Sequence, residues 1–173
     1  MHPDTRQRPI VVGIDGSPGA KAALRWALRQ ADRSGAEVEA VAVWAPQSTF
    51  TYGAEWAAGA VYTGGDLAAD TERMLLDTLV EVAREYGPSA PVRPHVVAGR
   101  PAEQLLLAAW SAQLLVLGGP VHGTVAGLLL GSVSHQCVQH ATCPVLVVPA
   151  EAAVPAHPGP ASRPSLPTTG KQP

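Results

Sequence analysis

Short apolar runs alternate with longer amphipathic stretches along most of this chain. The apolar runs are rich in β-branched residues and end at Gly, Pro, Asp or Ser, which is typical of buried strands. They predict strands at residues 10–14, 38–44, 92–98, 114–117 and 145–148.

Between these runs, apolar residues recur every three or four positions, with charged residues on the opposite face, which predicts helices. The first helix begins after Ser17 and Pro18, a capping residue followed by a first-turn proline, and it stops at Gly35. Further helices are predicted over residues 66–86, 102–112 and 132–141. Strands that alternate with helices of this length form βαβ units, in which parallel strands are covered on both faces. We therefore predict an α/β fold, with a doubly wound, mainly parallel five-stranded sheet and helices on both faces, of the Rossmann-like type.

The periodic pattern also predicts the domain limits. Residues 1–8 are polar and are expected to be a flexible N-terminus, and residues 9–149 form one domain. Residues 150–173 are punctuated by proline and almost lack large apolar side chains, so a disordered Pro-rich tail is predicted. Residues 46–65 are rich in Gly, Thr, Ala and aromatic residues, and are expected to form a long mobile loop or lid.

Composition narrows the classes of protein. A net charge of -2 provides no basic field, so binding to nucleic acid is not expected. The first residues lack the apolar segment of a secretory signal, and no apolar run approaches the roughly 20 residues of a membrane span, so we expect a cytoplasmic protein that does not bind membranes. Cys137 and Cys143 are the only cysteines and are expected to be reduced thiols.

The most informative stretch lies between the last two predicted strands. Gly118 and Gly119 follow one strand, and Gly131 and Ser132 open the helix that leads to the next. Glycines at such positions let backbone N–H groups approach an anion, and a helix N-terminus adds a favourable dipole. Asp15 follows the first strand and would meet this loop at the carboxyl edge of the sheet, although Asp before Gly is also common in simple turns.

Three other chemistries fit the residues less well. Gly118–Thr124 has the spacing of a P-loop without its lysine, which argues against that class of ATPase. The ligands of a zinc site would be His135, Cys137, His140 and Cys143. His135 and Cys137 do not share a helix face, so structural thiols are the better interpretation. Cys137 is instead expected in the core stripe of its helix, together with Val138 and Ala141. A hydrolase triad could use Ser132 or Ser134 with His122 and Asp15, but no nucleophile elbow is present.

Over residues 9–149 the chain resembles the universal stress protein family. The resemblance rests on the opening IVVGIDGSPGAKAALRWAL, on GRPAE at residues 99–103, and above all on GLLLGSVSHQCVQHATCPVLVV at residues 127–148. Members that bind ATP carry G-x2-G-x9-G-[ST] between the last two strands. Here Gly118, Gly131 and Ser132 match this motif, but Val121 replaces its second glycine. A β-branched residue disfavours positive φ and adds bulk where the backbone would approach phosphate.

The resemblance implies a dimeric signalling module that binds ATP, with or without Mg, or a related adenine nucleotide, and that is read by an unknown downstream protein. The homodimer would form through the strand Val145–Val148. Any ATP hydrolysis would be slow and incidental, and the protein is not expected to be an enzyme. The alternative is a nucleotide-free dimeric adaptor, which Val121 favours. The predicted nucleotide-binding residues are Ile14, Asp15, Val43, Gly118, Gly119, Val121, Gly131, Ser132 and Val133.

Overall fold

The computed structural model describes residues 8–45, 64–87, 90–119 and 130–150, and it confirms the predicted α/β architecture. The strands are β1 (Ile10–Gly13), β2 (Val38–Trp44), β3 (Val92–Ala98), β4 (Leu114–Gly118) and β5 (Val145–Val148). The helices are α1 (Pro18–Ser34), α2 (Gly64–Tyr86), α3 (Pro101–Ala108) and α4 (Ser132–His140), with a short 3-10 helix, η2 (Ala109–Ser111), after α3.

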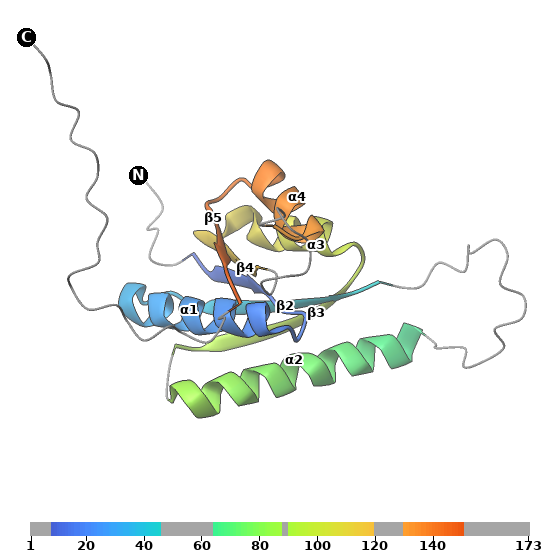
Figure 1. Ribbon diagram of the computed structural model, residues 1–173, viewed down its shortest axis with the longest axis horizontal. Coiled ribbons are helices and arrows are strands. Elements are labelled where there is room, and N and C mark those ends of the chain that lie inside the picture. The colour runs from blue at the N-terminus through green and yellow to red at the C-terminus, as the bar shows by residue number, and fades with distance from the viewer. Residues whose placement is uncertain (1–7, 46–63, 88–89, 120–129, 151–173) are drawn as a thin grey trace, which may run out of the picture.

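All five strands are parallel and lie in the order β3-β2-β1-β4-β5. Helices α1 and α2 cover one face of the sheet, and α3 and α4 cover the other (Figure 1). β2 and β3 follow β1 on one side of the sheet, and β4 and β5 lie on the other side of β1. The strand order therefore reverses between β1 and β4, which is the point where open parallel sheets bind their ligands.

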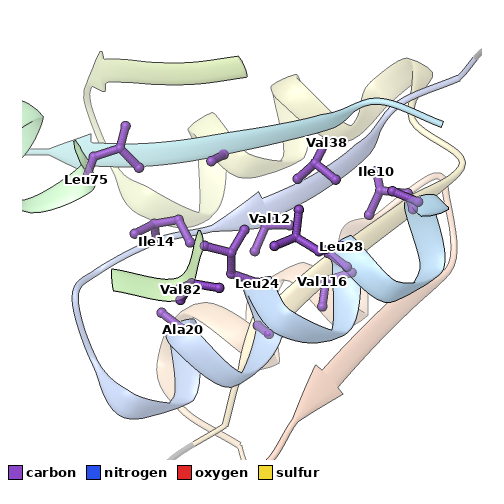
Figure 2. Close-up of a cluster of buried hydrophobic side chains, with 14 of the residues drawn as sticks. Ile10, Val12, Ile14, Ala20, Leu24, Leu28, Val38, Leu75, Val82 and Val116 are labelled. Carbon is purple, nitrogen blue, oxygen red and sulfur yellow. The ribbon is translucent and has the colours of Figure 1, made fainter. Parts of the chain in front are cut away.

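Each face of the sheet has its own apolar core. On the α1 side, Val12 of the central strand packs with Leu24 of α1 and Val116 of β4 (Figure 2). On the other side, Val11 packs in a cluster that contains Leu105 of α3 and Cys137 of α4. Because successive side chains of a strand point to opposite faces, β1 is buried on both sides, which explains its continuous apolar sequence.

Helix α1 begins at the carboxyl edge of the sheet. The Ser17 hydroxyl accepts a hydrogen bond from the Ala20 N–H at 3.1 Å, and Gly35, with φ 72°, ends the helix as predicted. Gly19 in its first turn lies so close to β4 that a Cβ there would be 2.4 Å from the Gly119 carbonyl oxygen. The start of α1 is therefore packed directly against the end of β4.

Several predicted boundaries differ from the structure. The helix predicted over residues 102–112 begins at Pro101 and ends at Ala108, after which η2 tightens the chain, as often happens at helix ends. Val138, which we expected to share the core stripe of Cys137, is 49% exposed because α4 buries only Ser134 and Cys137. Helix α2 starts two residues earlier than predicted, at Gly64, whereas β1 and α4 each end one residue earlier, at Gly13 and His140.

The remaining predicted segments fall outside the described residues. These are residues 1–7 of the predicted flexible N-terminus, residues 46–63 of the predicted loop, and residues 151–173 of the predicted tail. In the part of the chain that is described, no helix is both long and apolar enough to cross a membrane.

Candidate functional site

A cavity of about 210 Å³ lies at the carboxyl edge of the sheet, where β1 and β4 end. Its walls come from β1, β2 and β4 and from the N-terminal parts of α1, α3 and α4, so it occupies the point where the strand order reverses. The lining residues are Gly13, Ile14, Asp15, Ala20, Val41, Val43, Pro101, Leu105, Leu117, Gly118, Val133 and Ser134.

Gly13 keeps the floor of the cavity open. A Cβ on this residue would lie 2.9 Å from Cδ2 of Leu117 and 3.3 Å from the Leu105 side chain, both of which line the cavity. The backbone of Gly13 does not adopt a positive φ, so its conformation does not require glycine. A glycine inside a strand commonly marks a place where a ligand or another backbone approaches closely.

Asp15 is both a turn residue and a residue of the cavity wall, the two roles that the sequence left open. One of its carboxylate oxygens accepts the Ser17 N–H at 3.0 Å, which is the local turn interaction expected of Asp before Gly. The same residue lines the cavity and is exposed to solvent. An exposed carboxylate at the mouth of a cavity can accept hydrogen bonds from hydroxyl or amino groups of a ligand.

The N-terminal turn of α4 contributes Val133 and Ser134 to the cavity wall. Gly131 is the N-cap, with φ -71° and no side-chain capping bond, and a Cβ there would meet no atom within 4 Å. Neither backbone conformation nor packing within the described residues therefore requires glycine at this position. An uncapped helix start with open space in front of it is suited to binding an anion.

Ser134 is a site residue that the sequence did not predict in this role. Its side chain is 5% exposed, and its hydroxyl donates to the Gly118 carbonyl oxygen across a long 3.4 Å contact. This contact connects the first turn of α4 with the end of β4. Ser134 thereby helps to hold the two halves of the predicted phosphate loop together.

At Gly118 and Gly119, unlike at Gly131, a side chain would meet neighbouring atoms. A Cβ on Gly118 would lie 2.3 Å from the carbonyl carbon of Gly19, and one on Gly119 would lie 3.3 Å from the Pro149 Cα. Packing of the backbone around β4 therefore accounts for the lack of a side chain at Gly118 before any ligand is considered.

Of the predicted nucleotide-binding residues, the structure brings five together in the cavity wall: Ile14, Asp15, Val43, Gly118 and Val133. Gly119, Gly131 and Ser132 are not part of that wall, although Gly119 adjoins Gly118 and Ser132 adjoins Val133. Val121 lies outside the described residues.

Other residues of the cavity wall were not predicted from the sequence. Gly13 was recognisable as a glycine inside an apolar strand, and Pro101 as a residue that follows the exit of β3. Leu105 and Val41 gave no such signal, since an apolar residue on a helix or strand is most often simply part of the core.

The two thiols are structural in character. Cys137 is fully buried and Cys143 is half-buried, and burial raises the pKa of both thiols above the ordinary value. His135 and His140 are exposed on α4, whereas Cys137 points into the core. Within residues 8–45, 64–87, 90–119 and 130–150, no group of three His, Cys, Asp or Glu side chains could hold a metal ion.

A larger cavity of about 570 Å³ lies between α2 and the edge strand β3, with Glu72, Leu76, Pro94 and Val96 among its walls. It is open and includes no residue from β1 or β4. Position in the fold therefore favours the smaller cavity as the ligand site.

Comparisons with known proteins agree with the fold. The sequence model of the universal stress protein family matches residues 7–149. A universal stress protein of Mycobacterium tuberculosis is 36% identical over 148 residues, which is 84% of this chain but 46% of that relative, so this chain spans about half of the relative's length.

Solved structures of the same family superpose over most of the chain. A family protein from Burkholderia pseudomallei is 28% identical with a TM-score of 0.59, and the match covers 86% of this chain and 100% of that one. A universal stress protein solved in complex with cAMP is 25% identical with a TM-score of 0.56, over 84% of this chain and 98% of that one. The match of the family's sequence model to most of the chain, together with the observed strand order, shows that this protein belongs to the universal stress protein family.

Proposed function

We propose that this protein binds ATP or a related adenine nucleotide in the cavity at the ends of β1 and β4. The observation that carries the proposal is the composition of the cavity wall, which combines apolar side chains and one carboxylate with the first turn of α4. A nucleotide presents groups that match these: a flat base, a ribose with hydroxyls, and phosphate. The relative solved with cAMP adds support, because it shares this fold at 25% identity.

Each part of the wall suits one part of the ligand. Val41, Val43 and Leu105 offer apolar surface to the base, and Asp15 can accept from ribose hydroxyls or from an amino group of the base. The first-turn N–H groups of α4 would donate to phosphate, aided by the helix dipole and, at Ser132, by a hydroxyl. The open space at Gly131 lets phosphate approach the backbone closely.

The proposal is tested by adding nucleotide to the purified protein and following its thermal unfolding. A ligand at about 100 times its Kd stabilises the folded state by about 2.7 kcal/mol, which shifts the midpoint by several degrees. ATP with Mg and AMP should be compared with GTP at the same concentrations. No shift at millimolar adenine nucleotide would refute nucleotide binding, and an equal shift with GTP would refute specificity for adenine.

Val121 favours a second candidate function, a nucleotide-free adaptor. It replaces a glycine of the motif and lies outside the described residues, so the sequence alone carries this argument. The variant Val121→Gly separates the two candidates. Tighter ATP binding in the variant than in the natural chain would show that valine weakens an existing site, whereas no binding in either would favour the adaptor.

We propose further that two copies pair through β5. This strand forms one edge of the sheet, consists of four apolar residues, and each of them is only half-buried. The opposite edge, β3, contains Pro94 and the exposed Arg93 and His95, which are features that discourage strand pairing. An apolar edge without such protection is suited to a second copy of the same strand.

The pairing can be blocked at the outer edge of β5 without disturbing the sheet. The Gly119 N–H donates to the Val148 carbonyl, and the Leu115 N–H donates to the Pro144 carbonyl. The backbone N–H and C=O groups of the even-numbered residues of β5 therefore point toward β4, and the N–H of Val147 points away from the sheet. Val147→Pro should therefore yield a folded monomer in sedimentation analysis, whereas Leu146→Pro should disrupt the sheet. A natural chain that sediments as a monomer would refute the pairing.

We infer that the protein signals through an unknown downstream protein in the cytoplasm and does not act as an enzyme. Any ATP hydrolysis would be slow because the sequence offers no P-loop lysine and no convincing general base. Turnover of small esters that Ser132→Ala abolishes would contradict this view.

A further inference from the structure

The two faces of the sheet are not covered equally. On one face, α1 packs over β1, β4 and β5, and α2 packs over β2 and β3 (Figure 1). On the other face, α3 packs against β1 and β2, and α4 packs against β5. The strip of β3 on this second face is left largely open, and its residues Arg93 and His95 are exposed. Because parallel sheets are ordinarily covered on both faces, this strip is suited to packing against another molecule.

A hollow of about 270 Å³ lies in this strip, between α3 and the strands β2 and β3. Val41 and Val97 give it apolar walls on the sheet, and Leu107 does so on α3. Glu39 and His95 bring polar side chains to the same hollow. It shares only Val41 with the cavity at the ends of β1 and β4, so it is a separate site.

The hollow contains a carboxylate whose charge is not neutralised. Arg93 lies beside Glu39 in the register of β2 and β3, yet its guanidinium contacts the Glu37 carboxylate at 2.9 Å. Arg100, which follows β3, pairs with Glu103 at 3.2 Å. Within the described residues, the partly buried Glu39 carboxylate has neither a hydrogen bond nor an ion pair. A cationic group is therefore the natural complement of this hollow.

An apolar patch extends the surface beyond the hollow. Leu107 is 66% exposed and Trp110 is 72% exposed, more than any other large apolar side chain of the described residues. They are three residues apart where α3 passes into η2, so they lie on one side of these helical turns. Exposed apolar patches mark interaction sites, and tryptophan is enriched among the residues that dominate binding energies. A small cation in the hollow would leave this patch uncovered, which favours a protein segment as the occupant.

We propose that this docking surface, formed by Glu39, Val41, Val97, Leu107 and Trp110, binds a segment of a different protein in which an arginine or lysine stands among apolar residues. The cation pairs with Glu39, its aliphatic stem contacts the two valines, and the flanking apolar residues cover Leu107 and Trp110. A second copy is not needed here, because the proposed pairing uses β5, at the opposite edge of the sheet from β3. The inference rests on the proposed signalling through a downstream protein and is independent of nucleotide binding.

A random peptide library displayed on phage, selected on the full-length protein without nucleotide, tests the proposal. The enriched peptides should share a basic residue next to apolar ones. In calorimetric titrations with the tightest of these peptides, Glu39→Gln and Trp110→Ala should each raise the Kd at least tenfold. Asp77→Asn is the matched control, since Asp77 is exposed on α2, on the other face of the sheet, and it should change the Kd by less than twofold. Urea unfolding of each variant checks that the fold is retained.

The outcomes separate this inference from the signalling role. A smaller effect in either site variant, or enriched peptides without a basic residue, would overturn the docking surface and leave signalling through a partner intact. No enriched peptide at all would overturn both. A change of oligomeric state in Trp110→Ala, seen by sedimentation, would identify a second copy as the occupant and would overturn the choice of a different protein.

Discussion

Replacing Gly118 by alanine should destabilise the fold, because the space for a side chain is already filled. A Cβ at this position would lie 2.3 Å from the carbonyl carbon of Gly19, 2.5 Å from the Ala20 nitrogen and 2.7 Å from the Gly19 oxygen. All three are backbone atoms of α1, so no side-chain rotation can relieve the contact. Gly118 does not have a positive φ, so the expected effect is steric rather than conformational.

The size of the effect follows from these distances. An ordinary contact begins near 3.4 Å, so the start of α1 and the end of β4 must separate by about 1 Å. Such a gap forfeits a quarter to a half of the dispersion attraction across it, and overpacking in well-packed interiors costs about 1–3 kcal/mol or more. The lower entropy of the unfolded chain returns about 0.4–1 kcal/mol. We expect the free energy of unfolding to fall by about 2 kcal/mol or more.

Gly131→Ala is the matched control, since a Cβ there meets no atom within 4 Å. The loss of a favourable N-cap glycine and the gain in unfolded-state entropy should nearly cancel, so we expect a change within about 0.5 kcal/mol. Urea unfolding of both variants without nucleotide, with unchanged m-values, gives the comparison. A loss below about 1 kcal/mol for Gly118→Ala, or an equal loss for Gly131→Ala, would refute the reasoning.

Three further predictions concern packing, capping and titration. Leu75→Ala should lower the free energy of unfolding by about 2–5 kcal/mol because Leu75 is fully buried. Leu76 is 44% exposed, so Leu76→Ala should lower it by less than about 1 kcal/mol. Equal losses in urea unfolding would contradict the packing of α2. Ser17→Ala should cost about 1 kcal/mol through loss of the capping bond from Ala20, and a variant as stable as the natural chain would contradict this role. Burial raises the pKa of the Cys137 thiol above 9.0, so as pH rises the unfolded chain loses this proton before the folded chain does. The free energy of unfolding should therefore fall as pH rises past 9.0. Cys137→Ala should reduce this dependence on pH, and an unchanged slope would contradict the reasoning.

The order of elements and the place of the site could be predicted from the sequence because both follow from local patterns. Val11 and Val12 belong to a continuous apolar run, which indicates a strand buried on both faces, and the structure confirms it. Asp15 and Gly118 follow two such runs. Since parallel strands end at the same edge of the sheet, these residues were expected to meet there, and they do.

The parts that could not be predicted depend on how helices cross the sheet. Leu105 and Leu107 both lie on α3, but only Leu105 is buried against the cavity, whereas Leu107 is 66% exposed. The same applies to Val138, which was expected in the core. Which apolar residue of a short helix faces inward is decided by the rotation of the helix about its axis, and this rotation is set by packing with residues distant in the chain.

Gly118 and Gly131 belong to one sequence motif but are constrained by different physics. Gly118 forms a steric unit with Gly19, and that contact is needed for α1 to pack against β4 whether or not the protein binds a ligand. Gly131 has no such partner in the described residues. Gly118 would therefore be required equally in a nucleotide-binding protein and in a nucleotide-free adaptor. The two candidate functions must therefore be distinguished at the start of α4, where no atom of the described residues would meet a Cβ on Gly131, and by the variant Val121→Gly.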